Sequence, residues 1–469
     1  MKILFIVPPD TLRIESSVSE KLDKGRELRA ALGLLCVAGA VQKLDNVETS
    51  LLDCPALNFG YEEIKSEILK FKPDLVALSA LTFSLLDALK TARVAKSVYP
   101  QAKVCIGGFH VNLFPEETLR QEEIDIIVYG EGEKPFHALV TALRDGKYEE
   151  ICKIEGIGFK ENGRAILNGP GEINKDMDKL SSPAYNLLDL QKYSHVLAES
   201  GNSISMQTSR GCPYRCLFCD IRGTKLRYKS PEKVIEEVIS LKNMGISDFF
   251  FVDDTISVNR ERLKNICKII IKENLNIQYR ISARVDTVDS EVLALLKKSG
   301  CNRISYGVES GCQRLLDYLE KGITLSQIHA AFRMTRDAGI QTFAFLLIGI
   351  PTETEEEMYR SVDFLKKIKA DYANISICTP YPKTALYQRM REEGIIQKDI
   401  WQLFAENPEE DFEVSFWNKN FSDAELRMIQ DKLMKKFYRR PSYIFRQLLR
   451  IKSAKELAGK AKMGLKILK

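Results

Sequence analysis

The sequence predicts an α/β protein with a doubly wound N-terminal domain, a partial (β/α)6 barrel and a helical C-terminal region. Apolar strands alternate with helically patterned segments along most of the chain. The strands lack the polar alternation of half-exposed strands, which indicates parallel sheets covered on both faces. Six consecutive βα units in the second half favour a partial barrel over an open sheet. A chain of 469 residues, 45% hydrophobic and 28% charged, fits two or three globular domains.

The first predicted domain covers residues 1–145. Its expected strands are Lys2–Val7, Glu48–Leu52, Asp74–Ser79, Lys103–Ile106 and Ile124–Tyr129, and its expected helices are Leu32–Leu44, Tyr61–Phe71, Ser84–Val98 and Pro115–Gln121. Residues 146–198 follow as a hairpin, Ile151–Asn168, and a linker. Glu161-Asn162-Gly163 has the composition of a hairpin turn, and Ser181-Ser182-Pro183 that of a connection.

The predicted barrel covers residues 199–400. Its strands are expected near Ile204–Thr208, Phe249–Val252, Gln278–Ser282, Arg303–Gly307, Thr342–Ile348 and Asn374–Thr379, and its helices near Pro231–Met244, Arg260–Glu273, Ser290–Ser299, Leu325–Ala338, Glu355–Ile368 and Ala385–Glu393. In such barrels the chemistry lies at the carboxyl ends of the strands.

The last predicted region, residues 401–469, is helical and basic. From Lys435 to Lys469 there are twelve Lys or Arg residues and one acid, Glu456, so positive charge is concentrated in this tail. Apolar residues between the basic ones would suit an amphipathic helix on an anionic membrane surface. A solvated helix closing the bottom of the barrel is the alternative. No nucleic-acid-reading motif accompanies the charge, so we expect no nucleic-acid partner.

Localisation is predicted to be cytoplasmic, with peripheral membrane contact open through the tail. No apolar run approaches the roughly 20 residues of a membrane span, and the N-terminus has no secretory pattern. Without export, the eleven cysteines are expected to be reduced, and most stand singly in apolar patterns.

Three cysteines form the one cluster in the sequence. Cys212, Cys216 and Cys219 lie on the loop between the first barrel strand and its helix. Soft thiolates select zinc or iron-sulfur, and a structural zinc usually takes four protein ligands. No fourth Cys or His is close in sequence. A 4Fe-4S cluster held by three cysteines keeps one iron open to chelate a small molecule.

This CxxxCxxC motif, with Phe218 before the last cysteine, resembles that of the radical S-adenosylmethionine (radical SAM) superfamily. The resemblance implies that the open iron binds S-adenosylmethionine and that reductive cleavage yields a 5′-deoxyadenosyl radical. It also implies an electron donor such as a flavodoxin or ferredoxin.

The later strand ends resemble the cofactor contacts of the same superfamily. The expected cofactor-binding residues are Phe218, Asp253, Ser282, Arg284, Glu309 and Gly349, and the candidate catalytic carboxylates are Glu309 and Asp254. Alternatives stay open: either aspartate could cap a helix, and Arg284 could belong to a surface ion pair. Lys321 and Tyr381-Pro382 also lie in stretches typical of this group, with less defined roles.

A doubly wound domain ahead of this barrel resembles the cobalamin-binding group, in particular the branch of anaerobic magnesium-protoporphyrin monomethyl ester cyclases and hopanoid-modifying enzymes. The resemblance implies a Rossmann-like cobalamin-type domain. Small residues after its strands would let a corrin lie over the sheet edge; they are Ser79, Thr82, Gly107, Gly108, Gly130 and Glu131.

One departure concerns the cobalt. Domains that supply a histidine carry Asp-x-His-x-x-Gly after the first strand, and here that position reads Pro8-Pro9-Asp10-Thr11-Leu12-Arg13. Ligation of cobalt by histidine is therefore not expected. His110 is a remote candidate, and a structural imidazole is the alternative. The other reading of the domain is a retained fold that no longer binds corrin.

Three functions follow. The first is cobalamin-dependent radical methyl transfer to an unactivated position of a small molecule. The second is radical oxidation, cyclisation or rearrangement of a tetrapyrrole or lipid. The third is a non-catalytic iron-sulfur or corrinoid carrier. It would require that the cofactor contacts at the strand ends have been lost, and the presence of Glu309 and Gly349 argues against this. The sequence leaves the substrate open.

Overall fold

The computed structural model describes residues 1–14, 28–193, 202–441, 443, 444 and 447. These residues form two compact units. The first contains Leu28–Tyr193 and Lys398–Val414 together with residues 1–14, and the second contains the described parts of residues 202–397 and 415–447.

The first unit is built on a seven-stranded sheet in the order β2-β1-β3-β4-β5-β6-β7. The first five strands are parallel, whereas β6 and β7 are antiparallel additions at one edge. The strands are β1 Lys2–Val7, β2 Glu48–Asp53, β3 Leu75–Ser79, β4 Lys103–Gly107, β5 Ile126–Val128, β6 Ile157–Glu161 and β7 Arg164–Leu167. The helices are α2 Leu32–Val41, α3 Cys54–Leu57, α4 Tyr61–Phe71, α5 Leu85–Val98, α6 Phe109–Leu113, α7 Pro115–Arg120 and α8 Glu133–Arg144.

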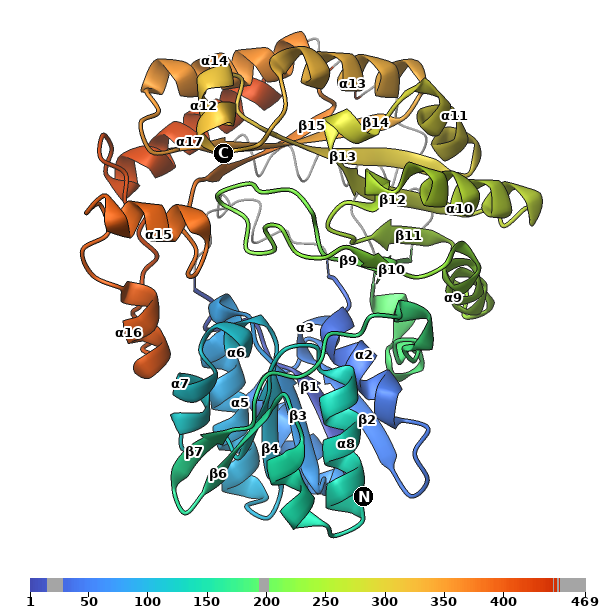
Figure 1. The fold of residues 1–469 in the computed structure, drawn as a ribbon, viewed down its shortest axis with the longest axis vertical. Coiled ribbons are helices and arrows are strands. Elements are labelled where there is room, and N and C mark those ends of the chain that lie inside the picture. The colour runs from blue at the N-terminus through green and yellow to red at the C-terminus, as the bar shows by residue number, and fades with distance from the viewer. Residues whose placement is uncertain (15–27, 194–201, 442, 445–446, 448–469) are drawn as a thin grey trace. The chain divides into compact units, whose positions relative to one another are not determined.

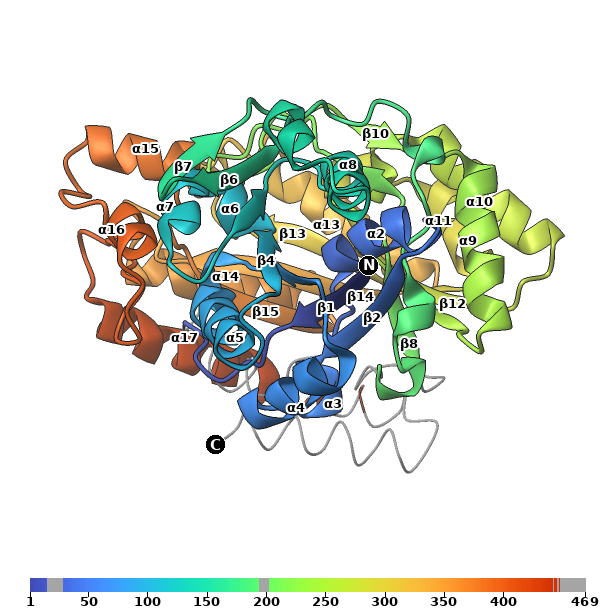
Figure 2. The same cartoon turned by 90° about the horizontal axis from the view of Figure 1, so that it is seen from below.

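Helices cover both faces of this sheet, with α2 and α8 on one face and α4 and α5 on the other (Figure 2). The strand interiors are apolar because both faces are buried: Ile3, Phe5, Ala77 and Cys105 belong to the core on the α2 and α8 side. The predicted doubly wound architecture is confirmed. In this strand order the switch point lies between β1 and β3, where parallel sheets of this kind bind ligands.

Two boundaries differ from the sequence expectation. The hairpin of β6 and β7 pairs with β5 and so extends the first sheet, instead of lying in a separate segment of residues 146–198. Helix α16, Ile400–Glu406, belongs to the first unit, where Trp401 meets Phe83 edge-on at 6.3 Å and Gln402 bonds Glu117 at 2.7 Å. The expected region 401–469 is therefore divided, because a short helix with a buried tryptophan contacts the first unit.

The second unit contains a six-stranded parallel sheet in the order β15-β14-β13-β12-β11-β8, as predicted. Its strands are β8 Ser203–Met206, β11 Asp248–Phe251, β12 Gln278–Ala283, β13 Cys301–Glu309, β14 Gln341–Ile348 and β15 Tyr372–Ile377. Two short strands, β9 Ser209–Arg210 and β10 Arg227–Tyr228, pair separately in antiparallel fashion. The helices are α9 Pro231–Asn243, α10 Arg260–Lys272, α11 Ser290–Lys298, α12 Gln313–Tyr318, α13 Leu325–Asp337, α14 Glu355–Lys367, α15 Ala385–Glu392 and α17 Asp423–Tyr438.

Helices α9, α10, α11, α13 and α14 follow the outer side of this curved sheet (Figure 1). All five begin at side-chain caps, for example Ser230 for α9 and Asn259 for α10. Along β14 the alternate residues Thr342, Ala344 and Leu346 are buried, while Phe345 on the opposite face is 39% exposed. A half-open barrel explains this pattern, since its concave side is less tightly filled than the helix-covered side.

Helix α17 protects the edge strand β15. Gln430 donates to the Ile375 carbonyl at 2.8 Å, and the Tyr438 hydroxyl donates to the Ala373 carbonyl at 2.7 Å. Side-chain groups thus satisfy backbone atoms that an edge strand would otherwise present for pairing. Within the described residues, no helix is long and apolar enough to cross a membrane.

Candidate active site

The loop that carries the three cysteines is closed at its base by the β9 and β10 pair. Gly211, which precedes Cys212, has φ +93°, and a Cβ there would lie 2.4 Å from the Lys225 carbonyl oxygen. The Cys212 amide donates to Thr224 Oγ1 at 2.9 Å. Only glycine permits the two arms of the loop to approach so closely, so the backbone itself gathers the cysteines.

The three thiols influence one another. Burial above all, together with the negative charges of Asp220, Cys216 and Cys212, raises the pKa of Cys219 to about 12. Burial also raises the pKa of Cys216, with Cys212 again adding to the rise. Mutually repelling thiolates in a partly buried loop suit a bound cationic metal centre, which deprotonates its thiols outright.

The donor set fits a cluster. Within the described ranges, no three His, Cys, Asp or Glu side chains are gathered closely enough to hold a single metal ion. A 4Fe-4S cluster attaches each cysteine to a different iron, so its cysteines need not converge on one point. Three thiolates at one loop leave the fourth iron for another ligand.

Two aspartates follow β11, and both bind the cysteine loop. Asp253 is buried and accepts hydrogen bonds from the Thr208 amide at 2.7 Å, from Thr208 Oγ1 at 3.0 Å, and from the Ser209 amide and hydroxyl. Asp254 accepts from the Gly211 amide at 3.0 Å. Neither caps α10, because Asn259 does so. The described contacts of Asp253 are thus those of a residue that positions the loop, and its contact with the cofactor stays a prediction.

Arg284 lies after β12 and is buried against the cysteine loop. Its guanidinium pairs with both carboxylate oxygens of Asp286 at 3.0 Å, stacks on the Tyr214 ring at 3.6 Å from the centroid, and lies 3.9 Å from Cys216 Sγ. The ion pair left open by the sequence exists, but only 7% of the arginine is exposed. Ser282, half-buried on β12, lies in register with Ser305 of β13.

Glu309 ends β13 and pairs with Lys321 at 2.7 Å. Lys321 Nζ lies 5.7 Å from the centroid of the Phe218 ring, so Phe218 and Glu309 are brought to the same side of the loop. Gly349 follows β14 with φ +71°, and its carbonyl accepts from Asn418 at 2.9 Å. Lys321 joins the site through α12 and its following turn, which sequence spacing could not place.

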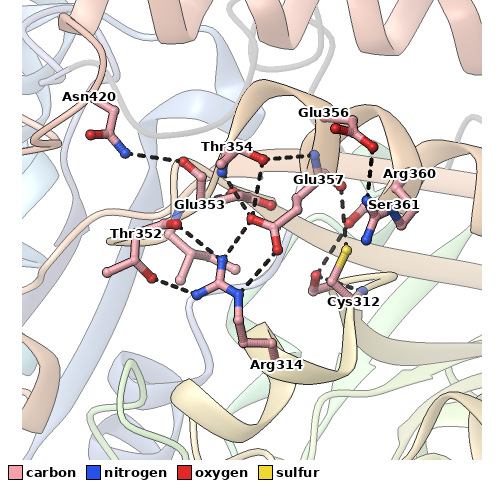
Figure 3. A network of polar contacts seen from close by, with 12 residues as sticks. Cys312, Arg314, Thr352, Glu353, Thr354, Glu356, Glu357, Arg360, Ser361 and Asn420 are labelled. Atoms are coloured by element: carbon pink, nitrogen blue, oxygen red, sulfur yellow. Dashed lines mark hydrogen bonds and ion pairs between the residues drawn. The ribbon is translucent and has the colours of Figure 1, made fainter.

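A polar network holds the turn after β14 (Figure 3). Arg314 of α12 bonds Glu357 of α14 at 2.7 Å and the Thr352 hydroxyl at 2.9 Å. Glu353, fully buried, accepts from the Ile350 amide at 3.1 Å. Burial raises the pKa of Glu353 to about 8. Sequence reasoning missed Glu353, because it stands among Thr352, Thr354 and Glu355, and this polar surrounding gives no signal of burial.

The first unit gathers the predicted corrin contacts at the carboxyl ends of β3, β4 and β5. Gly108 has φ +103°, and a Cβ there would lie 2.7 Å from both Ala80 O and Ser79 Oγ. Gly107 is directly before it, at the end of β4. A Cβ on Gly130 would meet nothing within 4 Å, and Leu81 is 52% exposed. This edge combines accessible backbone with apolar surface, which suits a large flat ring.

Other residues predicted to contact the corrin form hydrogen bonds within the first unit. Thr82 Oγ1 lies 3.2 Å from Nδ1 of the fully buried His110, and Glu131 accepts from the Asn174 amide at 2.9 Å. The loop after β1, where a cobalt-binding histidine would stand, is held by Asp87, which accepts from Thr11 and Leu12. Hydrogen bonds to Asp87 therefore fix this loop without a histidine.

Comparisons with known proteins support both units. Residues 206–365 match the Radical SAM superfamily, and residues 29–140 match the B12 binding domain. An uncharacterized methyltransferase of Pyrococcus horikoshii is 32% identical over 96% of this chain and 95% of its own length. The anaerobic magnesium-protoporphyrin IX monomethyl ester cyclase of Rubrivivax gelatinosus is 28% identical over 76% of this chain and 65% of its own.

The fold is also that of a solved structure. The radical S-adenosylmethionine methyltransferase TsrM of Kitasatospora setae, with tryptophan and an S-adenosylmethionine analogue bound, has a TM-score of 0.69 and 20% identity over 84% of this chain and 76% of its own. The two matched domains imply a 4Fe-4S cluster, S-adenosylmethionine and cobalamin as cofactors. The chain belongs to the cobalamin-binding group of the radical S-adenosylmethionine superfamily and is an enzyme of that group.

Proposed function

We propose that this enzyme transfers a methyl group to an unactivated position of a small molecule, using cobalamin as the methyl carrier. The observation that carries the proposal is the pairing of a cysteine loop fit for an open-iron cluster with a glycine-lined sheet edge fit for a corrin. The methyltransferase of Pyrococcus horikoshii, which is related over nearly the whole chain, supports methyl transfer.

Different residues would hold the cluster and position its loop. Cys212, Cys216 and Cys219 would hold the cluster, which with bound S-adenosylmethionine supplies a 5′-deoxyadenosyl radical. Asp253 and Asp254 keep the cysteine loop against β11 through its backbone amides. These hydrogen bonds restrict loop motion, and a rigid loop is a condition for reproducible placement of a reactive cofactor.

Two further groups complete the proposed S-adenosylmethionine site. We propose that the Glu309 carboxylate receives a cationic ammonium and that the segment after Gly349 offers backbone to an adenine. Arg284, whose charge is balanced by Asp286, packs its guanidinium beside Cys216. In the first unit, Ser79, Gly107, Gly108 and Gly130 would lie beneath the corrin.

A second function is favoured by one observation. The related cyclase of Rubrivivax gelatinosus acts, by its name, on a magnesium tetrapyrrole. Radical oxidation or cyclisation of a tetrapyrrole or lipid therefore stands as the alternative chemistry. In either case we propose a flavodoxin or ferredoxin as electron donor. The proposed peripheral membrane contact rests on the basic tail, most of which lies outside the described residues.

Anaerobic reconstitution separates the two functions. The holoenzyme is incubated with S-adenosylmethionine and dithionite, with and without cobalamin, and 5′-deoxyadenosine and S-adenosylhomocysteine are measured. S-adenosylhomocysteine that forms only with cobalamin supports methyl transfer. Deoxyadenosine without S-adenosylhomocysteine supports the alternative. Absence of both products from a protein with an intact cluster contradicts radical chemistry altogether.

A further inference from the structure

Glu309 adopts a strained backbone conformation at the end of β13. Its φ is +59°, in the left-handed region that non-glycine residues rarely occupy. The pairing of β13 with β14 shifts register between Gly307 and Glu309. Such irregularities change the direction of a side chain and strain the backbone locally. The fold therefore tolerates a local strain energy that fixes the direction of the Glu309 carboxylate.

The space above Gly307 is filled by an ion pair. A Cβ on Gly307 would lie 2.3 Å from Glu309 Oε1 and 2.6 Å from Lys321 Nζ. The Lys321 and Glu309 side chains are only 9% and 7% exposed, and their charged atoms are 2.7 Å apart. Any larger residue at position 307 would displace the pair, which is therefore held in one place by strand geometry.

Lys321 is tied to the cysteine loop from two sides. Its ammonium lies 5.7 Å from the centroid of Phe218, and its carbonyl accepts from Arg284 Nη2 at 2.9 Å. The Leu217 amide, next to Cys216, donates to the carbonyl of Leu319, two residues before Lys321, at 2.9 Å. The turn that carries Lys321 is thus held against the segment of the loop that contains Cys216 and Phe218.

The two cations differ in their counter-charges. Arg284 is neutralised by Asp286, which pairs with it through two hydrogen bonds. Among the described residues, Lys321 Nζ has Glu309 as its hydrogen-bonding partner. Glu309 is also the carboxylate proposed above to receive the ammonium of S-adenosylmethionine. Glu309 thus faces both a fixed cation and the proposed site of a mobile one.

We propose that Lys321 is a positioning residue that holds the Glu309 carboxylate for S-adenosylmethionine and whose charge favours the reduced state of the cluster. The inference rests on the proposed function, since it assumes that the three cysteines hold a cluster. A cluster gains negative charge on reduction, and its potential depends on nearby charge and solvent exposure. A cation fixed in a poorly solvated position stabilises that added charge, and the adjacent carboxylate opposes it.

Ligand binding alters this balance. A cation that pairs with Glu309 compensates the carboxylate and leaves more of the Lys321 charge uncompensated toward the cluster. Binding of S-adenosylmethionine should therefore make the cluster easier to reduce, and easier reduction should favour binding in return. The Lys321 and Glu309 pair would thus couple reduction of the cluster to the presence of S-adenosylmethionine, the molecule that receives the electron.

The test measures the cluster, not turnover. Full-length protein is reconstituted anaerobically, and its reduction potential is determined by spectroelectrochemical titration with and without S-adenosylmethionine, together with the Kd of S-adenosylmethionine. The variants are Lys321→Gln, Lys321→Arg, Glu309→Gln and their Gln/Gln double variant. Lys268→Gln, which removes an exposed lysine on α10, is the matched control.

Opposite shifts are expected from the two neutral single variants. Lys321→Gln should lower the reduction potential and Glu309→Gln should raise it, while Lys321→Arg and Lys268→Gln should stay near wild type. The double variant should return toward the wild-type potential, yet bind S-adenosylmethionine at least tenfold more weakly. Glu309→Gln should also lose most of the potential shift caused by S-adenosylmethionine.

Shifts of the same sign in both single variants, or no shift beyond that of Lys268→Gln at equal cluster content, would overturn the inference. A merely structural role predicts the same sign, because either change would loosen the same loop. Failure of the proposed function is seen separately, as a wild-type protein that assembles no 4Fe-4S cluster or yields no deoxyadenosine.

Discussion

Glu353 offers a quantitative prediction because its carboxyl group is fully buried in the turn after β14. Burial raises its pKa to about 8; hydrogen bonds from the Ile350 and Gly349 amides oppose the rise, and Arg314 opposes it only weakly. Arg314 is already paired with Glu357 at 2.7 Å. The folded protein therefore keeps Glu353 protonated and neutral near pH 7.

The change to test is Glu353→Gln, which retains the shape of a neutral carboxylic acid and cannot ionise. In wild type, the unfolded chain releases the Glu353 proton near its ordinary pKa, while the folded chain retains it up to about pH 8. The free energy of unfolding should then fall by about 1.4 kcal/mol for each pH unit between those limits. The variant lacks this contribution.

Urea unfolding of both proteins at pH 5.5 and pH 7.5 measures the effect. The difference in unfolding free energy between variant and wild type should move in favour of the variant by about 2 to 3 kcal/mol over that interval. Glu355→Gln, at an exposed position two residues further on, should show no comparable trend. A wild-type minus variant difference that is independent of pH would refute the argument.

The remaining predictions concern the two cofactor sites. Replacing Cys216 by Ala should abolish cluster absorbance and 5′-deoxyadenosine formation. A variant that loses only part of its cluster iron and keeps full activity would contradict this prediction. Asp253→Asn should lower the cluster content at least several-fold, because it weakens a carboxylate that holds Thr208 and Ser209; unchanged iron and sulfide content would count against that role. Gly108→Ala should cost about 1 to 3 kcal/mol of stability and weaken cobalamin binding at least tenfold by absorbance titration, and wild-type affinity would place the corrin elsewhere. Truncation after Arg440 should strongly reduce binding to anionic liposomes, whereas equal binding would exclude the tail as a membrane contact.

Pattern predicted the fold well where burial dominates the sequence. The six barrel strands were located because each is a short segment with apolar or aromatic residues that alternates with helices of regular apolar face. The hairpin was also recognised, from the turn at Asn162. Its pairing with β5 was not, since strand partners separated by many residues leave no local signal. Helix α16 was assigned to the tail for the same reason.

For the candidate site, too, local patterns were predictable and long-range contacts were not. Local spacing was sufficient to group Cys212, Cys216 and Cys219, and order along the barrel was sufficient to place Arg284 and Glu309 at strand ends. It could not show that Asp253 binds the loop backbone, or that Lys321 lies over Gly307. Each of these depends on the close approach of segments that are distant in sequence.

The sequence by itself determined the fold class, the cysteine loop and the family, because periodicity and motif spacing are properties of short segments. The tertiary structure decided which charges face one another, Lys321 with Glu309 and Arg284 with Asp286, and it buried Glu353 against backbone amides. Burial and counter-charge set the electrostatics of a site, and both arise only when parallel strands bring their carboxyl ends to a common edge.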